Sequence, residues 1–561
     1  MPFISADRRR VLAGLAATTA IATHPLRLKA HEAFPNSLFR HGVASGDPDA
    51  TSVVLWTRIT ARGEQDVEWE LADTQSFKKI LARGVVTTGS DRDHTVKVLA
   101  NGLAPGGVYY FRFKHGDVHS PIGRTRTLPT GKLERLGIAL VSCSNYAFGY
   151  FNAYDAIASD ASVDYVLHTG DYIYEYGSDG WGGEIARLLG RVHEPAHEIV
   201  SLADYRQRHA QYKTDHCSQA MHAAHPLLAC WDDHESTNNP WMGGAQNHQP
   251  ETEGDWAERR AASIRAYYEW MPVREPEWLA PAGRNHQQFW RSYSFGDLAL
   301  LHTLETRHTA RAKQIDYADY SEAGDATHDA VAKALNAPDR PMLSAALERD
   351  LANALRGSVE AGQPWRLIGN PMPIARTHVP DVAALGLVPD PSAFEAARVL
   401  AWKGRHNLPF YPDTWDGYGW ARERLYRLSR EAGASDLIFL TGDSHSFWAN
   451  ALADEGGHPA GIELGTAGVS SPGDFVESGF DSARAAALDQ AFAAHNPEIR
   501  WTDNLHQGYV RLELQHGGSE ATFIAVDTTL DQIYRTSILQ QFSLIKTAAG
   551  VEISDASAPT I

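Results

Sequence analysis

Two short polar stretches carry the residues best suited to chemistry in this chain. Residues 170–175 are Gly-Asp-Tyr-Ile-Tyr-Glu and residues 442–445 are Gly-Asp-Ser-His, and each stretch follows a run of residues typical of a buried strand. Open α/β sheets hold their ligands at the carboxyl ends of the strands. Carboxylate, phenol and imidazole groups at such an edge indicate a metal-dependent hydrolase.

Polar groups follow four of the expected strands. Cys143 follows the first of these strands, Asp171 and Tyr174 follow the second, and Asp443 and His445 follow the last. The remaining strand is followed by a mixed group of side chains: Asp232, Asp233, His234, Glu235, Asn238 and Asn239. Any one of these residues could instead form a turn or a helix cap, since Asp, Asn and Ser favour such local hydrogen bonds. Four strand ends with the same property favour one shared site.

The mixture of ligand types bears on the identity of the metal. A thiolate with a phenolate and carboxylates is strongly anionic and favours Fe3+, whereas carboxylate and amide oxygens alone favour Ca2+, Mg2+ or Mn2+. Zinc is the competitor, but it prefers tetrahedral sets of histidine and cysteine, and no such pair here has zinc-finger spacing. The ligand types therefore favour a site that holds more than one kind of metal ion.

The strands that position these groups alternate with helix-sized spacers. Apolar runs that predict them lie at residues 137–142, 164–169, 226–231, 298–303, 365–368 and 436–441. This alternation is typical of a layered α/β or α+β domain, which we expect over residues 131–530. Residues 32–130 show short alternating apolar runs separated by Gly, Pro, Asn and Asp. They predict an N-terminal antiparallel β-sandwich without a ligand cluster.

Composition and charge narrow the class of protein. The chain is 43% hydrophobic and 21% charged, its formal net charge is -18 at pH 7, and no apolar run is long enough to span a bilayer. Such acidity argues against a stable nucleic-acid partner, which needs a positive face. Residues 1–31, with Arg8, Arg9 and Arg10 before a weakly apolar stretch, resemble a twin-arginine export signal. They predict a periplasmic or secreted protein, although a frayed amphipathic helix is the alternative.

One arginine is a candidate anion-binding group. Residues 255–271 are expected to form a helix, and Arg260 falls on a stripe of that helix with Trp256 and Ile264. A buried guanidinium must be paired or directed at an anion, so Arg260 either binds the substrate phosphate or makes a structural salt bridge. Its neighbour Arg259 is expected to be solvated.

Two further features of the sequence, a pair of cysteines and the C-terminal tail, each have two possible structural interpretations. Cys217 and Cys230 could form a disulfide in an oxidising compartment, but buried free cysteines are common and their spacing does not decide the matter. The C-terminal tail, residues 531–561, contains an apolar stretch that is expected to form a helix. That helix would either pack against the body or cover the metal site as a lid.

Several motifs, taken in order along the chain, resemble the alkaline phosphatase D (PhoD) family. They are residues 42–48 with 55–58, 141–143, 170–175, 231–235, 415–418 and 442–445. The resemblance implies an exported phosphomonoesterase and phosphodiesterase, with an N-terminal sandwich followed by a metallophosphoesterase domain of the calcineurin-like superfamily. It also implies that the enzyme uses Fe3+ together with Ca2+, with two calcium ions expected.

The resemblance further implies roles for individual residues. Cys143, Asp171, Tyr174 and Asp443 would hold the iron, and Asp171 and Asp443 would also reach calcium. The cluster would be completed by Asp233, by Asn238 or Asn239, and by His445. Ordinary binuclear phosphoesterases carry Gly-Asn-His-Asp/Glu and Gly-His-x-His runs at these places, so their histidine ligands do not transfer to this chain.

The expected reaction is attack of a metal-bound hydroxide or oxide on phosphorus, with His234 or His445 as proton donor to the departing alkoxide. A related alternative is a phospholipase D-like diesterase that acts on lipid head groups, since iron-dependent enzymes of that type resemble the same family. An alternative from another class is a non-catalytic metal- or phosphate-binding protein. A substrate panel separates the first two functions, and loss of turnover with a chelator excludes the third.

Overall fold

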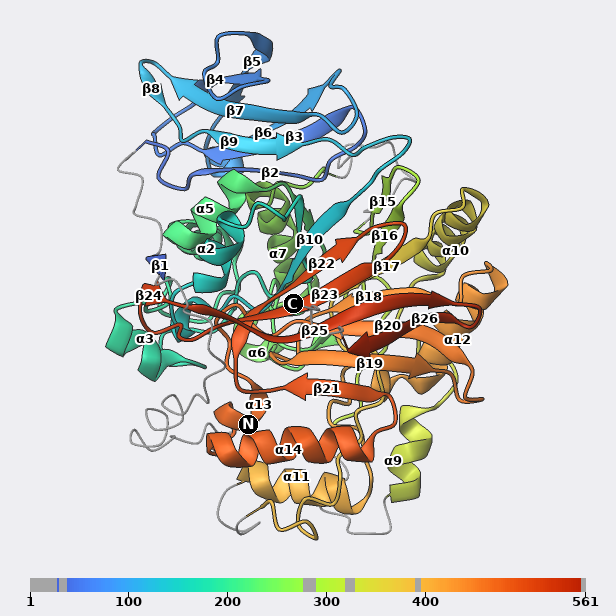
Figure 1. Cartoon of the computed structure of the whole chain (residues 1–561). Coiled ribbons are helices and arrows are strands. Elements are labelled where there is room, and N and C mark those ends of the chain that lie inside the picture. Colours follow the sequence, from blue (N-terminus) through green and yellow to red (C-terminus); the bar gives the residue numbers. More distant parts are fainter. Residues whose placement is uncertain (1–27, 30–37, 276–288, 318–327, 389–394, 556–561) are drawn as a thin grey trace.

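The computed structural model describes residues 28–29, 38–275, 289–317, 328–388 and 395–555 (Figure 1). Residues 1–27, which hold most of the predicted export signal, lie outside the described residues. The pair Leu28–Lys29 forms β1 and pairs with β24 (Ile533–Tyr534). Within the described ranges, no helix has the length and apolar character needed to cross a membrane.

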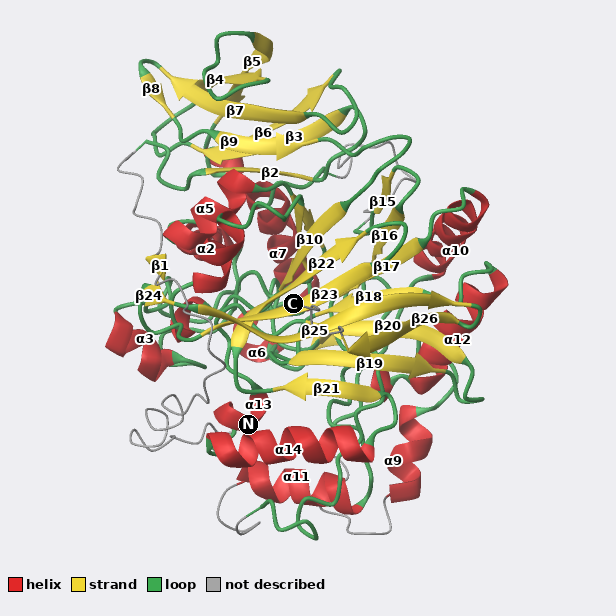
Figure 2. Cartoon of the chain, viewed as in Figure 1, coloured by secondary structure: helices red, strands yellow, loops and turns green. Residues whose placement is uncertain are grey.

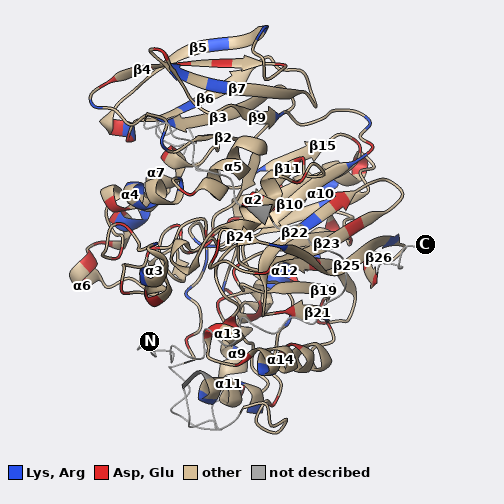
Figure 3. Cartoon of the chain, turned by 60° about the vertical axis from the view of Figure 1, so that its left-hand side comes forward, with Lys and Arg blue, Asp and Glu red and all other residues tan. Residues whose placement is uncertain are grey.

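A two-layered antiparallel sandwich stands at the top of the molecule in Figure 1. One layer contains β2 (Val43–Gly46), β3 (Ser52–Arg58) and β6 (Thr95–Asn101), and the other contains β4 (Gln65–Ala72), β5 (Ile80–Thr88), β7 (Val108–His115), β8 (Val118–His119) and β9 (Gly123–Arg126). Alternate residues such as Leu55 and Phe111 point into the shared core. Acidic and basic residues occur on β4 and β7 (Figure 3), and Arg112 of β7 forms an ion pair with Glu70 of β4. The sandwich predicted from the alternating pattern is therefore confirmed.

Two large sheets form the body of the molecule, and the first of them also supplies β2, β3 and β6 to the sandwich. Their strand orders are β26-β25-β23-β22-β10-β11-β12-β2-β3-β6 and β15-β16-β17-β18-β20-β19-β21. Parallel strands lie at both centres: β10 (Leu136–Val141), β11 (Tyr165–His168) and β12 (Leu227–Ala229) in the first sheet, and β16 (Ala299–Thr303), β17 (Trp365–Asn370), β18 (Leu437–Thr441) and β20 (Pro459–Gly465) in the second. All six strands predicted for this part are present, with boundaries shifted by one or two residues.

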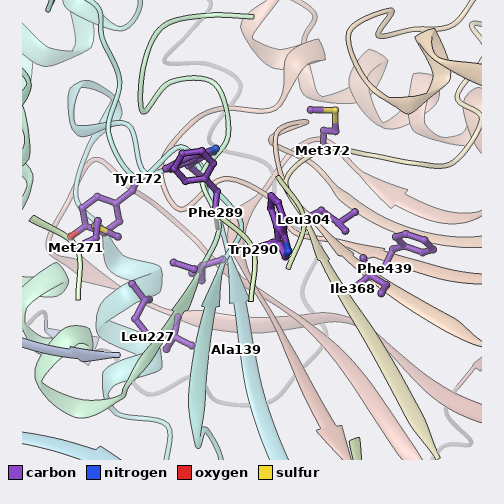
Figure 4. Packing of buried hydrophobic residues seen from close by; sticks show 14 of the residues in the cluster. Ala139, Tyr172, Leu227, Met271, Phe289, Trp290, Leu304, Ile368, Met372 and Phe439 are labelled. Carbon is purple, nitrogen blue, oxygen red and sulfur yellow. The ribbon is translucent and has the colours of Figure 1, made fainter. Parts of the chain in front are cut away.

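The two sheets enclose one apolar core, and helices cover their other faces (Figure 2). Ile138, Leu167 and Leu440 belong to the core between the sheets. A second cluster joins the sheets to the helices, and Figure 4 shows Leu227 and Phe439 within it. The main covering helices are α2 (Asn152–Ala158), α4 (Leu202–Tyr212), α5 (His216–Ala224), α7 (Trp256–Trp270), α10 (Ala345–Glu360) and α12 (Gly419–Glu431). Helix α7 begins where the Asp255 carboxylate caps Ala257 N–H, and it ends before a proline.

Shorter and peripheral elements complete the fold. The helices among them are α3 (Gly183–Leu189), α6 (Pro250–Glu253), α9 (His328–Leu335), α11 (Glu395–Arg405), α13 (Asp474–Glu477) and α14 (Ser482–His495). The strands are β13 (Pro240–Trp241), β14 (Gly244–Ala245), β15 (Ser292–Phe295), β19 (Phe447–Ala453), β21 (Ile499–Asp503), β22 (Gln507–Leu514) and β23 (Ser519–Val526).

The C-terminal tail forms strands, so the prediction of a helical tail is wrong. β25 (Thr536–Thr547) pairs antiparallel with β23 and with β26 (Gly550–Asp555) and extends the larger sheet. Phe542 and Leu544 lie two residues apart and both enter the core between the sheets. The apolar residues that suggested a helix therefore follow a period of two, which is the period of a strand.

Candidate metal centre

The carboxyl ends of the central strands of both sheets meet at one edge. A backbone bridge between Ser142 and Gly468 joins the end of β10 to the loop after β20. Five of the predicted ligands in these loops have positive φ angles: Cys143 (60°), Asp171 (57°), Asn239 (51°), Asp443 (66°) and His445 (51°). Residues other than glycine adopt this conformation at a cost in backbone energy, and they do so most often at functional sites.

Cys143, Asp171, Tyr174 and His445 form one fully buried group. Cys143 Sγ lies 3.5 Å from Asp171 Oδ2, and Tyr174 OH lies 3.3 Å from Asp171 Oδ2 and 3.3 Å from His445 Nε2. Burial, followed by the charge of Asp171, raises the pKa of the Cys143 thiol and of the Tyr174 phenol well above their usual values. Both groups would therefore ionise only beside a cation, and their donor set fits a ferric ion.

Four carboxylates form an adjoining group that shares Asp171. Ligand atoms of Asp171, Asp232, Asp233 and Asp443 lie within 4.8 Å of one another. Burial, and for Asp443 also repulsion from Asp232, raises the pKa of Asp171 and Asp443 well above the usual range. Carboxylates this close cannot all ionise without positive charge between them, so the group fits a hard cation such as Ca2+.

Arg307 is a fully buried cation within this acidic group. Its Nε and Nη2 atoms donate to the two Asp232 oxygens over 2.5 and 3.0 Å, and Nη2 lies 3.7 Å from Asp443 and 3.8 Å from Asp233. One guanidinium leaves the four carboxylates with a net negative charge. Sequence reasoning missed Arg307, although it follows β16 by four residues and so belongs to the same edge as the predicted ligands.

His234 is oriented by Glu175. Its Nδ1 atom lies 2.7 Å from Glu175 Oε2, and its Nε2 atom lies 3.9 Å from Asp233 Oδ1. Burial opposes protonation of the imidazole, but Asp233 and Glu175 outweigh it and raise the pKa of His234 well above its usual value. Glu175 is fully buried and also accepts hydrogen bonds from Asn238 N–H (2.8 Å) and Asn247 Nδ2 (2.9 Å). The pair presents a proton-bearing nitrogen toward the acidic group.

Glu235 fixes the loops that carry the ligands. Its carboxylate accepts the backbone N–H groups of Asp171 (3.1 Å), Tyr172 (2.7 Å) and Asp232 (2.9 Å). Burial raises its pKa to about 7 against the effect of these hydrogen bonds. One side chain therefore connects the loop after β11 to the loop after β12.

Two predicted amide ligands lie at the rim of the centre. Asn238 and Asn239 are partly exposed, and both of their Nδ2 atoms donate to Gln246 Oε1, over 3.2 and 2.8 Å. The backbone N–H of Asn239 donates to Asp233 Oδ2 over 2.9 Å. Asn239 is thus tied to the acidic group through its own backbone, whereas the backbone N–H of Asn238 donates to Glu175.

The arginines of α7 differ from expectation. Arg260 Nη2 donates to the carbonyl of His308 over 3.0 Å, and among the described residues Arg260 forms no ion pair and no contact with the metal centre. Arg259, which we expected to be solvated, is buried and pairs with Glu198 and Glu253 at 2.8 Å each. At the start of α7 the buried face therefore includes Arg259 and Ser263 in place of Arg260, whereas Ile264 on the predicted stripe is buried as expected. Cys217 and Cys230 are both buried and free, so they form no disulfide.

This chain resembles known proteins over nearly its whole length. The family described as PhoD-like phosphatase matches residues 138–523, and the N-terminal domain of PhoD-like phosphatases matches residues 24–129. Alkaline phosphatase D of Bacillus subtilis (strain 168) is 33% identical over 529 residues, which cover 90% of this chain and 82% of the relative. A solved structure described as "Structure of PhoD" matches with a TM-score of 0.74 and 29% identity, over 94% of this chain and 95% of the other.

Proposed function

The chain belongs to the PhoD-like phosphatase family of phosphoester hydrolases, and from this premise we propose that it is an exported, metal-dependent enzyme for phosphate monoesters and diesters. The observation that carries the metal assignment is the arrangement of Cys143, Asp171 and Tyr174 around one buried point, beside a group of four carboxylates. A thiol, a phenol and carboxylates converge in this way where a highly charged cation binds.

We assign iron to Cys143, Asp171, Tyr174 and Asp443. Calcium would lie among the carboxylates, with Asp233 and the amide of Asn238 or Asn239 as further ligands and His445 at the side of the cluster. The bound cations would acidify a water molecule and neutralise the phosphoryl oxygens during displacement.

Side chains near the proposed metal ions would donate the proton to the leaving group and balance part of the negative charge. His234 carries the proton for the departing alkoxide on Nε2, because Glu175 engages Nδ1. His445 is less suited to this role, because burial lowers its pKa to about 3 and leaves the imidazole neutral. Arg307 partly neutralises the acidic group and holds Asp232 in place.

We also propose the domain division that the sequence suggests, with a sandwich over residues 32–130 and the catalytic part over residues 131–530. The arginines at positions 8–10 support delivery by the twin-arginine translocation machinery. Replacement of two of them by lysine should retain the enzyme in the cytoplasm, which fractionation and immunoblotting would detect. Small phosphate esters are the expected substrates.

Metal analysis combined with a substrate panel tests the proposal. Protein from its own export route should contain iron and calcium, and it should hydrolyse p-nitrophenyl phosphate and bis-p-nitrophenyl phosphate until a strong chelator is added. Cys143→Ser should lose iron, whereas Cys217→Ser, at another buried free cysteine, should retain it. Turnover of phosphatidylcholine alone would favour the phospholipase D-like alternative, and full activity without metal would refute the proposal.

A further inference from the structure

Trp181 lies over the two histidines of the metal centre. It precedes α3 in a glycine-rich loop, and Gly182 beside it has a φ of 87°. The indole plane is 15° from the ring of His445, with ring centres 5.3 Å apart, and 19° from the ring of His234, with centres 6.5 Å apart. Only 7% of His234 and 8% of His445 is exposed, whereas Trp181 is partly exposed. The indole is therefore the outer layer over both imidazoles.

Several contacts fix the orientation of this ring. The indole N–H donates to the Glu477 carboxylate of α13, a segment almost 300 residues away in the chain. Phe148 packs edge-on at 4.7 Å, and Tyr176 lies 6.0 Å from Trp181 and 5.5 Å from His234. Tyr176 is also partly exposed. We call Tyr176 and Trp181 the aromatic rim.

The aromatic rim borders the place where the phosphate of a substrate is proposed to bind. Trp181 lies 5.3 Å from the ring of His445 and 5.5 Å from the ring of Tyr174, and both of these residues are predicted ligands. Carbon atoms next to a phosphate held at those ligands therefore lie beside the rim. Polar groups around the centre are also partly exposed, among them Asn238, Asn239 and Asp443. The rings and these polar groups thus offer different surfaces to the two parts of an ester, and the anionic phosphate fits the polar, metal-binding part.

We propose that the aromatic rim makes this site selective for phosphate esters whose alcohol part carries a flat aromatic ring. Aromatic rings attract one another beyond what burial of the same area provides, because of their quadrupoles. The inference rests on the proposed function, since it takes the predicted ligands as the place where the phosphate binds. It goes further by naming the substrate class and the residues that determine it.

The test compares two substrates of equal carbon number, benzyl phosphate and cyclohexylmethyl phosphate. The unmodified enzyme should favour the benzyl ester roughly ten-fold in kcat/KM, as expected for one aromatic contact. Trp181→Leu should reduce the preference to about one, and Trp181→Phe should keep most of it. Trp420→Leu is the matched control, because Trp420 is a partly exposed tryptophan on α12 that packs against Arg424. This control should leave the preference unchanged.

A binding measurement separates failure of the inference from failure of the proposed function. Calorimetry with benzylphosphonate and cyclohexylmethylphosphonate, which lack a cleavable ester bond, should show the same dependence on Trp181 in Kd. Selective binding of benzylphosphonate without turnover of either ester would refute the proposed function and support the aromatic rim. Equal kcat/KM for both esters, or a preference that survives Trp181→Leu, would overturn the inference while the proposed function stands.

Discussion

Replacing Glu175 by Gln tests whether the Glu175–His234 pair serves proton transfer. The two side chains are almost completely buried and meet at 2.7 Å. Within the described part of the chain, the imidazole is the only ionisable group that donates a hydrogen bond to Glu175. Gln keeps the shape of Glu but loses the charge that stabilises the imidazolium. A hydrogen bond to a charged group contributes about 1.5–3 kcal/mol. We therefore expect kcat to fall roughly 10- to 100-fold for alkyl phosphates, whose alkoxide must be protonated to leave.

The control is Glu463→Gln, at a carboxylate that is equally buried. From the residues that the structure describes, Glu463 accepts hydrogen bonds only from neutral groups, namely the backbone N–H groups of Ile374 and Ala375 and the side chains of Thr441 and Asn450. Both variants should lose stability in urea unfolding, but only Glu175→Gln should lose kcat for alkyl phosphates. Its kcat for p-nitrophenyl phosphate should change little, because p-nitrophenolate leaves without a proton. Equal losses for both substrates, or unchanged kcat for the alkyl ester, would refute the role of the pair.

Three other perturbations have expected outcomes. A tyrosinate bound to Fe3+ should give a visible charge-transfer absorption band, and a strong chelator should abolish both this band and turnover. Tyr174→Phe should remove the band from the spectrum of the metal-loaded protein. A colourless, fully active enzyme would contradict the iron assignment. Arg307→Met should lower the free energy of unfolding of the metal-free protein by about 3–5 kcal/mol, because it leaves Asp232 buried without its partner; a loss below about 1 kcal/mol in urea unfolding would contradict this. Burial lowers the pKa of Lys97 to about 8, below its unfolded value near 10.5, so stability should rise by about 3 kcal/mol as pH increases between these values. Lys97→Met should remove that rise.

Six central strands could be predicted because each is rich in apolar residues and is followed by polar residues. For example, a strand was predicted at residues 436–441, and β18 contains all of these residues except Asp436. The tail could not be assigned in the same way, because β25 contains apolar residues at both helical and strand spacings. Its pairing with β23, which decides between them, is a long-range contact.

The residues proposed as ligands could be selected from the sequence, whereas the residues that support them could not. Cys143 and Asp443 each lie two residues after the end of a buried strand, and four strand ends with such groups indicated one shared site. Arg259 and Arg260 are neighbours, and successive residues of a helix point about 100° apart, so only one of the two can lie at the centre of the buried face. At the start of a helix, too few apolar residues precede them to show from the sequence which one that is. Arg307 was missed because its partner Asp232 lies 75 residues away, and only the fold brings the two together.

The metal centre is a place where the chain does not maximise its own stability. Five predicted ligands occupy the left-handed backbone region, and the carboxylates of the acidic group face only one guanidinium at close range among the described residues. Both features raise the free energy of the metal-free state. Glu235 and Glu175 nevertheless hold the loops through buried hydrogen bonds, so the ligands stay near one another before a cation arrives. Under the proposed metal assignment, relief of this repulsion would add to the affinity for cations, and little of that affinity would be lost in ordering the loops.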